Sequence, residues 1–226
     1  MITRKTLQAL SLGAAAVLAG CATAPGSPAL GTQARNETAL QAEFQALMQA
    51  SFRSQGIASV ERLKQDAAQQ ACSTGQWPDA RTLQAIREAA QASIQPPADG
   101  RYLGDWKQGE KLAQDGRGLT WTDKSAEPGA NGAGCYNCHQ LSQAEVSHGT
   151  IGPSLRHYAR NRGATDLSSP QAQAAVRYTW GKLNNSWAAY PCSNMPRFGH
   201  NGMLSAEQIR HLMALLLDPA SPVNAP

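Results

Sequence analysis

The chain has 226 residues, of which 42% are hydrophobic and only 16% are charged, so a buried core is feasible and a wholly disordered chain is excluded. The net charge of +4 is too small to indicate nucleic-acid binding, and no basic run or aromatic-interleaved basic patch supports that function. We therefore expect a globular protein of one large or two small domains with no nucleic-acid partner.

Residues 1–20 have the pattern of a signal peptide. Arg4 and Lys5 precede an apolar stretch of about 12 residues, which is too short to span a bilayer as a mature helix. The stretch therefore predicts export, with residues 1–20 absent from the mature protein.

The signal peptide ends in Leu-Ala-Gly-Cys, a string that resembles a bacterial lipobox in which Cys21 becomes the acylated first residue. The alternative is an ordinary secretory signal cleaved elsewhere, such as after Ala24, although Pro25 is an unfavourable residue just after a cut. Several acyl chains on Cys21 would anchor the protein stably, whereas one chain would not. We expect a periplasmic protein that is held on a membrane through lipid on Cys21.

The next segments predict a tether and a helical extension. Residues 21–36 are small, contain Pro and Gly and lack periodicity, which favours a flexible tether. Apolar residues at helical spacing predict a helical extension over residues 37–98. Its helices are expected at Glu37–Phe52, Ser59–Cys72 and Asp79–Ser93. The Pro- and Gly-containing stretch at residues 95–100 then marks a domain boundary.

The second domain is expected over residues 99–226, again with helices and no hairpin signal or internal repeat. The helices are predicted at Asp105–Gln114, Pro170–Leu183 and Ser205–Leu217. Gly109 would allow the first of these helices to cross the last one closely. The fold class predicted for the whole chain is therefore all-α.

Two of these helices begin with a sequence typical of a capping box. In one helix Gln108 lies three residues after Asp105, and in the other Gln208 lies three residues after Ser205. Ile209, with the Leu and Met residues that follow it at helical spacing, is expected to form the buried stripe of the last helix.

The strongest chemical signal is Cys-Tyr-Asn-Cys-His at residues 135–139. This spacing is typical of covalent c-type haem attachment, in which Cys135 and Cys138 add to the haem vinyl groups and His139 coordinates the iron. A thioredoxin-like redox pair would require a βαβ context, and a zinc site would require a second ligand pair at finger spacing; neither is present. We expect one covalently bound haem c.

A proline-containing loop follows thirteen residues after the histidine. A proximal histidine needs a hydrogen-bond acceptor on its outer ring nitrogen, and the backbone carbonyl of Pro153 can provide it. The fixed φ of Pro153 would hold this carbonyl in place. An ordinary turn is the alternative.

The sixth iron ligand should come from later in the chain. Met195 lies in an irregular loop before Pro196, which suits a ligand that must reach the iron from a loop. His200, another histidine and Met203 are the alternatives, whereas Met213 is expected in the core.

The predicted helix at residues 170–183 is expected to wall the haem. Lys182 and Arg197 are candidates for pairing with the haem propionates. Solvated charge is the alternative for both side chains.

The five cysteines can all be assigned. If Cys21 carries lipid and the Cys-x-x-Cys pair carries haem, Cys72 and Cys192 are left over. An exported protein with two remaining cysteines most simply joins them, so we predict a Cys72–Cys192 disulfide. The alternative is a pair of independent buried thiols.

Five stretches of the second domain together match a known family. They are Asp105-Trp106-Lys107-Gln108-Gly109-Glu110, Gly134-Cys135-Tyr136-Asn137-Cys138-His139, Gly149-Thr150-Ile151-Gly152-Pro153-Ser154-Leu155, Met195-Pro196-Arg197-Phe198-Gly199-His200 and Ala214-Leu215-Leu216-Leu217-Asp218-Pro219. With these stretches, residues from about 99 to 224 resemble the SoxX family, the monohaem c subunits of the SoxAX complex of bacterial thiosulfate oxidation. The helical extension resembles that of the longer members, while the lipobox and the Cys72/Cys192 pair are not general features of the family.

The resemblance implies a class I cytochrome c-like domain with His139 and Met195 as the axial iron ligands. It also implies a heterodimer with a dihaem or monohaem SoxA-like subunit, which together act as an L-cysteine S-thiosulfotransferase. The complex joins thiosulfate to a cysteine of a SoxYZ carrier, with the sulfur chemistry in SoxA. This chain would then have no catalytic residue of its own and would pass the released electrons to a soluble cytochrome c.

Two other functions are compatible with the residues alone. One is a freestanding, membrane-tethered electron carrier with no enzymatic partner. The other is a haem-based sensor, which would need an open or labile sixth position.

Overall fold

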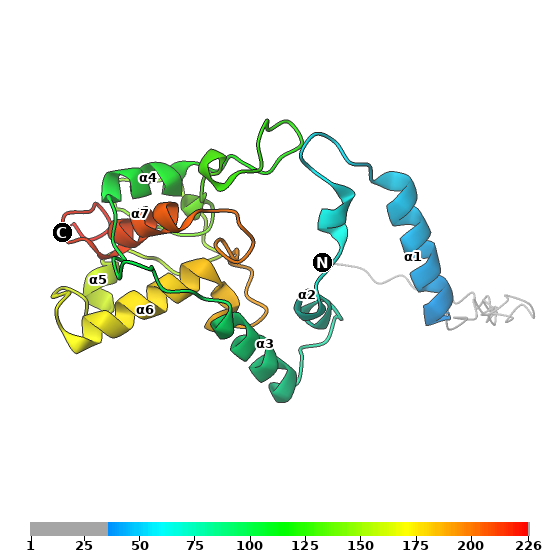
Figure 1. Ribbon diagram of the computed structural model, residues 1–226, viewed down its shortest axis with the longest axis horizontal. Helices are drawn as coiled ribbons and strands as arrows, with labels where there is room; N and C mark the ends of the chain where they lie inside the picture. The colour runs from blue at the N-terminus through cyan, green and yellow to red at the C-terminus, as the bar shows by residue number, and fades with distance from the viewer. Residues whose placement is uncertain (1–35, 226) are drawn as a thin grey trace, which may run out of the picture. The chain divides into compact units, whose positions relative to one another are not determined.

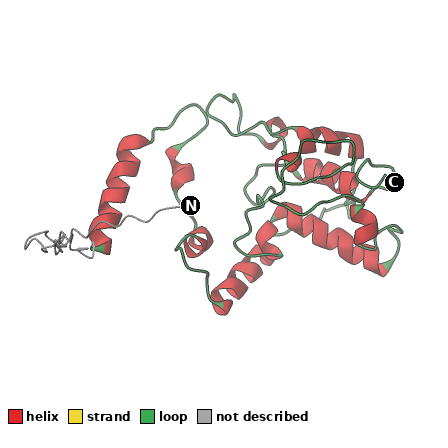
Figure 2. Cartoon of the chain, turned by 180° about the vertical axis from the view of Figure 1, so that it is seen from behind, coloured by secondary structure: helices red, strands yellow, loops and turns green. Residues whose placement is uncertain are grey.

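The computed structural model describes residues 36–225. Within them lie seven α-helices and no β-strand, so the all-α prediction is confirmed (Figure 2). The predictions for the signal peptide, for Cys21 and for most of the tether lie outside the described residues. The helices are α1 (Glu37–Ser51), α2 (Ala67–Cys72), α3 (Ala80–Ala92), α4 (Trp106–Gln114), α5 (Tyr158–Asn161), α6 (Pro170–Asn184) and α7 (Ala206–Leu217).

The chain divides into two units. One ends at Ala50 and contains nearly all of α1, and the other begins at Ser51. The helix expected from residue 37 is therefore present, but none of its residues is buried, and Phe44 and Leu47 of its apolar stripe are exposed. No helix within residues 36–225 combines the length and apolar character needed to cross a membrane.

The prediction of a single helix over Ser59–Cys72 is wrong. The structure has a short 3₁₀ turn, η1 (Val60–Leu63), and then the separate helix α2. Asp66 has extended backbone angles, and its carboxylate accepts a hydrogen bond from the N–H of Gln69, whose side chain in turn accepts from the N–H of Asp66. This capping box starts a new helix where the apolar pattern alone predicts continuation.

The main core lies where α4 crosses α7, with α6 packed against α7 (Figure 1). The close approach predicted at Gly109 is confirmed, because a Cβ there would meet the backbone of His211 and lie 2.9 Å from Cβ of Leu215. Along α7, Ile209, Leu212 and every residue from 213 to 217 are buried. This core supports one wall of the cavity described below.

The two predicted capping boxes have different outcomes. The box of Ser205 and Gln208 is confirmed at the start of α7. Asp105 caps α4, but its carboxylate accepts from the N–H of Lys107, and Gln108 does not close the box. The N–H of Asp105 donates instead to Nδ1 of His211 (2.9 Å), so α7 occupies the position that Gln108 was expected to fill.

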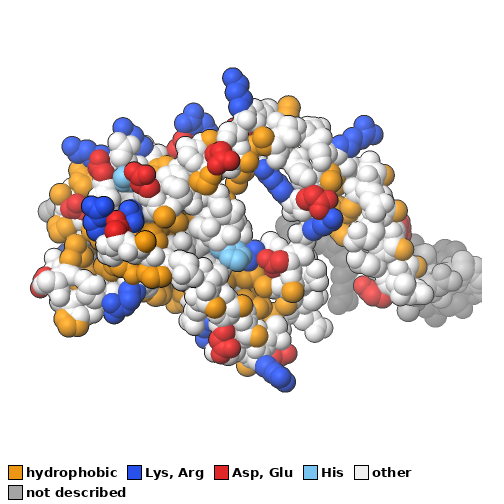
Figure 3. All heavy atoms as spheres, in the orientation of Figure 1, with side chains coloured by type: hydrophobic (Ala, Val, Ile, Leu, Met, Phe, Trp, Pro, Cys, Tyr) orange, Lys and Arg blue, Asp and Glu red, His pale blue; other side chains and the backbone are white. Residues whose placement is uncertain are grey.

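A second, smaller core cluster joins α3 and α2 to the later part of the chain. Ile86 and Ala90 of α3 pack with Trp187 of the 3₁₀ turn η4 (Ser186–Ala188). Basic and acidic side chains are interspersed over the face seen in Figure 3. Because this cluster joins α2 and α3 to the later part of the chain, residues from Ser51 onward form one compact unit that holds these helices of the extension and the later domain.

Candidate functional site

One tight turn presents the three residues of the Cys-x-x-Cys-His motif. Gly134 precedes the 3₁₀ turn η3 (Cys135–Asn137) with a φ of 55°, a conformation that glycine adopts without strain. The N–H groups of Cys138 and His139 then both donate to the carbonyl of Cys135, at 3.1 and 2.9 Å. Five consecutive residues therefore present two sulfur atoms and an imidazole from one turn.

The proline-containing loop packs closely on this turn. The N–H of Gly149 donates to the carbonyl of Tyr136, and the N–H of Gly152 donates to that of Cys138, each at 2.8 Å. A Cβ at Gly152 would collide with the imidazole ring of His139. Glycine at this position therefore lets the loop lie directly against the ring.

His139 makes the hydrogen bond that the sequence predicts. Its Nδ1 lies 2.7 Å from the carbonyl oxygen of Pro153. Because a carbonyl can only accept, Nδ1 carries the proton in this contact and Nε2 keeps its lone pair free. The loop therefore fixes the tautomer that can coordinate a metal through Nε2.

The turn, the loop and Met195 line a single cavity of about 660 Å³. This volume is in the range of cavities that hold a cofactor-sized ligand. Most of the remaining wall is apolar, including Leu141, Leu183 and Phe198. The chain thus brings Cys135, Cys138, His139, Pro153 and Met195 to one cavity.

The alternative sixth ligands are placed elsewhere. His200 lines a different, smaller cavity, and Met203 packs against the main core without reaching the cavity wall. Met213 is fully buried in that core, as the sequence predicts. Among these candidates only Met195 shares a cavity with His139.

The surroundings of Cys135 do not favour thiol redox chemistry. Burial raises the pKa of its thiol to about 12, whereas a reactive cysteine needs a lowered pKa. Within residues 36–225, no three His, Cys, Asp or Glu side chains gather in an arrangement that could hold a metal ion.

Two cations also line the cavity. Arg162 lies over the ring of Tyr178 at 4.5 Å, and Lys182 lies over that of Tyr190 at 4.6 Å. Burial, with the nearby charge of Arg162, lowers the pKa of Lys182. Neither side chain pairs with an acidic residue in the described part of the chain.

Arg162 was missed by the sequence reasoning, because nothing in its local sequence links it to residue 182. The placement expected for Arg197 is wrong: its guanidinium pairs with Asp66 at 3.0 Å and does not line the cavity. Arg197 thus pairs with the carboxylate of Asp66, the N-cap of α2, in place of a haem propionate.

The predicted disulfide is confirmed. Cys72 and Cys192 are bonded, with their Cα atoms 5.5 Å apart and 120 positions apart in sequence. Cys135 and Cys138 are free. This is the pairing expected once the motif cysteines are set aside.

No family model matches the chain. It is similar to a protein of Aquifex aeolicus (strain VF5) described as an uncharacterized lipoprotein, with 35% identity over 166 residues, which cover 71% of this chain and 73% of that protein. Identity at this level over most of both sequences establishes common descent. The chain belongs to the same family as this lipoprotein of Aquifex aeolicus.

Proposed function

We propose that the chain is an electron-transfer cytochrome with a class I cytochrome c-like domain that carries one haem c. The observation that carries the proposal is the single cavity lined by Cys135, Cys138, His139 and Met195. These side chains are the two thioether attachment sites and the histidine–methionine ligand pair of a c-type haem. The haem, when bound, supplies reversible one-electron chemistry.

The residues around the cavity would hold this group in one orientation. Cys135 and Cys138 would fix one porphyrin edge covalently, and His139 would present Nε2 because Pro153 holds its Nδ1 proton. The Met195 thioether would favour the reduced state relative to a second imidazole. The apolar wall would exclude water and keep the local dielectric constant low.

The two cations would complement the negative charge of the haem carboxylates. Arg162 and Lys182 lack acidic partners among the described residues, and both line the cavity. Charge-assisted hydrogen bonds to carboxylates are stronger than neutral ones, especially at a partly buried site. Lys182 would thus pair with a haem carboxylate, as the sequence predicts, and Arg162 would do so in place of Arg197.

The location follows from the N-terminal sequence and the relative. The chain carries a lipobox-like string ending at Cys21, and its relative is described as a lipoprotein. The Cys72–Cys192 disulfide fits an oxidising compartment. We infer a protein outside the cytoplasm, in the periplasm, anchored to a membrane through lipid on Cys21.

The resemblance to SoxX implies the reaction that this chain would serve. A carrier cysteine thiolate and thiosulfate combine as R–S⁻ + ⁻S–SO₃⁻ → R–S–S–SO₃⁻ + 2 e⁻, on a SoxA-like partner. One sulfur–sulfur bond forms, and the two electrons leave one at a time. This chain would accept them and pass them to a soluble cytochrome c.

The test is a tagged pull-down from native membranes, followed by haem staining and mass spectrometry. The expected result is a stoichiometric partner that carries its own Cys-x-x-Cys-His motif and a modified cysteine. Adding thiosulfate and carrier protein to the complex should then reduce the haem of this chain. A matched control is the Cys135→Ser/Cys138→Ser variant, which should lose the stain at the mass of this chain.

Two other outcomes would revise the proposal in different ways. A methionine-ligated haem protein isolated without a partner would leave a freestanding, tethered electron carrier and reject the SoxX assignment. A chain matured without any covalent haem would reject the cytochrome itself.

A further inference from the structure

The loop that carries Met195 is built on the short turn η4. The hydroxyl of Ser186 donates to the carbonyl of Met195 (2.6 Å), and the indole N–H of Trp187 donates to the carbonyl of Ser193 (2.8 Å). The N–H of Met195 also bonds to the Ser193 hydroxyl at 3.2 Å. The position of Met195 therefore depends on where η4 and its loop are held.

The first tie from the helical extension to this loop is covalent. Cys72, the last residue of α2, is bonded to Cys192, three residues before Met195. Cys192 has a φ of 61°, a left-handed conformation that a non-glycine residue rarely adopts. Such a conformation persists only where the surrounding structure determines it, so the disulfide lies at a fixed point of the loop.

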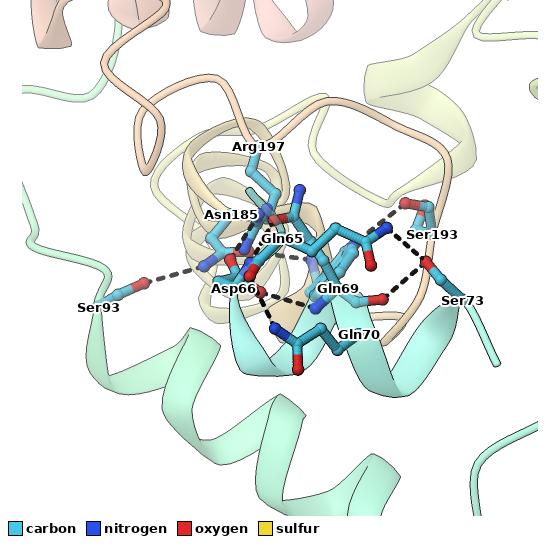
Figure 4. Close-up of polar contacts among 10 residues, drawn as sticks. Gln65, Asp66, Gln69, Gln70, Ser73, Ser93, Asn185, Ser193 and Arg197 are labelled. Atoms are coloured by element: carbon cyan, nitrogen blue, oxygen red, sulfur yellow. Dashed lines mark hydrogen bonds and ion pairs between the residues drawn. The ribbon is translucent and has the colours of Figure 1, made fainter. Parts of the chain in front are cut away.

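The second tie is an ion pair on the other side of Met195. The guanidinium of Arg197 lies 3.0 Å from the carboxylate of Asp66, the N-cap of α2 (Figure 4). The Arg197 side chain is only 9% exposed, and it lies over the ring of Trp187 at 4.4 Å. A cation this buried needs its partner, because an unpaired buried charge is costly.

The third tie is an apolar contact between the helical extension and η4. Trp187 is buried against Ile86 and Ala90 of α3, and three residues of α2 pack around this cluster. The members of this cluster are distinct from those of the main core. The α2 residues of the cluster are Ala68, Ala71 and Cys72.

We propose that α2 is a clamp that positions Met195 in the cavity. It holds the loop before the methionine through Cys72–Cys192 and after it through Asp66–Arg197. This inference rests on the proposed haem and assigns Asp66 and Cys72 as positioning residues for its sixth ligand. Without the clamp the loop would open more often, and Met195 would lie in the cavity, where its thioether could bind the haem iron, for a smaller fraction of the time.

The fraction of open loop can be measured with free imidazole. Imidazole binds the ferric iron only when Met195 has left, so its apparent affinity rises in proportion to the open fraction. The experiment uses the full-length matured protein in its wild-type form and as Asp66→Ser and Cys72→Ser/Cys192→Ser variants. Serine at position 66 still caps the helix, since Ser and Asp are similar N-caps, but is too short to reach Arg197.

We expect imidazole to bind the Asp66→Ser variant at least about fivefold more tightly than wild type, and the double cysteine variant at least about tenfold more tightly. The absorption band of methionine-ligated ferric haem should weaken in the same order. The matched control is Asp79→Ser, because the Asp79 carboxylate also caps a helix, α3, but its hydrogen bonds among the described residues go only to Thr82. Its affinity should equal that of wild type.

Imidazole affinities of both clamp variants within twofold of wild type would overturn the clamp. If the double cysteine variant does not fold, the imidazole affinity of Asp66→Ser alone tests the clamp, because this variant keeps its helix cap. The wild-type spectrum separates this result from failure of the proposed function. A wild-type protein with methionine-ligated haem and insensitive variants rejects only the clamp, whereas a wild-type protein without that ligation rejects both proposals.

Discussion

The contact between Gly152 and His139 is the tightest restraint on a single side chain of the site. A Cβ at position 152 would enter the space of the imidazole, so Gly152→Ala must displace either the ring or the loop that carries Pro153. We expect the variant to lose most of its haem incorporation, measured as haem stain per unit protein after maturation. Gly129→Ala is the control, since nothing lies within 4 Å of a Cβ there. Equal incorporation in both variants would contradict the geometry of the turn.

The identity of the sixth ligand is tested by changing Met195 itself. Met195→His should lower the reduction potential by roughly 0.1 V or more, because imidazole stabilises the oxidised iron better than a thioether does. Redox titration of the matured protein measures this change. Met203→Leu should leave the potential unchanged, since Met203 does not line the cavity. A potential that responds to Met203→Leu and not to Met195→His would reverse the ligand assignment.

Residues of the site that are close together in the chain were predictable from their local sequence. Cys135, Cys138 and His139 lie in one turn, and Pro153 lies in a loop that hydrogen-bonds directly to that turn. Arg162 and the partner of Arg197 were not predictable, because both depend on which distant elements pack together. Pairing Arg197 with Asp66 needs contacts across 131 positions of sequence.

Among the elements, the crossing of α4 and α7 is the most sensitive to volume. Gly109→Ala would place a Cβ against the His211 backbone and 2.9 Å from Cβ of Leu215. We expect a loss of about 1–3 kcal/mol in the free energy of unfolding, the usual cost of overpacking. Chemical denaturation of the matured protein measures it. Gln108→Ala at the neighbouring exposed position is the control, and an equal effect of both changes would show that the helices do not cross here.

Long helices with a clear apolar stripe were predicted within a few residues. The helices α3, α6 and α7 match the predicted ranges, and the cap of α7 was also predicted. The region before α2 was not, because the capping box at Asp66 interrupts a pattern that is compatible with one continuous helix. Apolar spacing is compatible both with one long helix and with a 3₁₀ turn followed by a short helix. The two reciprocal hydrogen bonds between Asp66 and Gln69 favour the second structure.

At the scale of the whole molecule, the disulfide connects the extension to the later domain. Cys72 and Cys192 are separated by 120 residues, so their bond restricts a large part of the unfolded chain. The Cys72→Ser/Cys192→Ser variant should lose about 2–4 kcal/mol in the free energy of unfolding, within the usual range for such a crosslink. The denaturation midpoint measures the loss, and the wild-type protein unfolded with a dithiol present should match the variant. An unchanged midpoint in both would mean that the bond does not form in solution.

The cysteine count predicted this pairing, but it could not predict its consequence. Nothing in the sequence places Cys72 and Asp66 on either side of the loop that carries Met195. That arrangement arises from the packing of α2 and α3 around Trp187. Residues from Ser51 onward, with both α2 and α3, form one compact unit.

We propose that one haem is held covalently by Cys135 and Cys138, and the intact mass of the matured protein would show it. The protein should be expressed together with a cytochrome c maturation system and compared with its Cys135→Ser/Cys138→Ser variant. We expect the wild-type mass to exceed the mass of the mature polypeptide by one haem, and the variant to show no such increase. A wild-type mass without haem, from cells that mature other c-type cytochromes, would contradict the account.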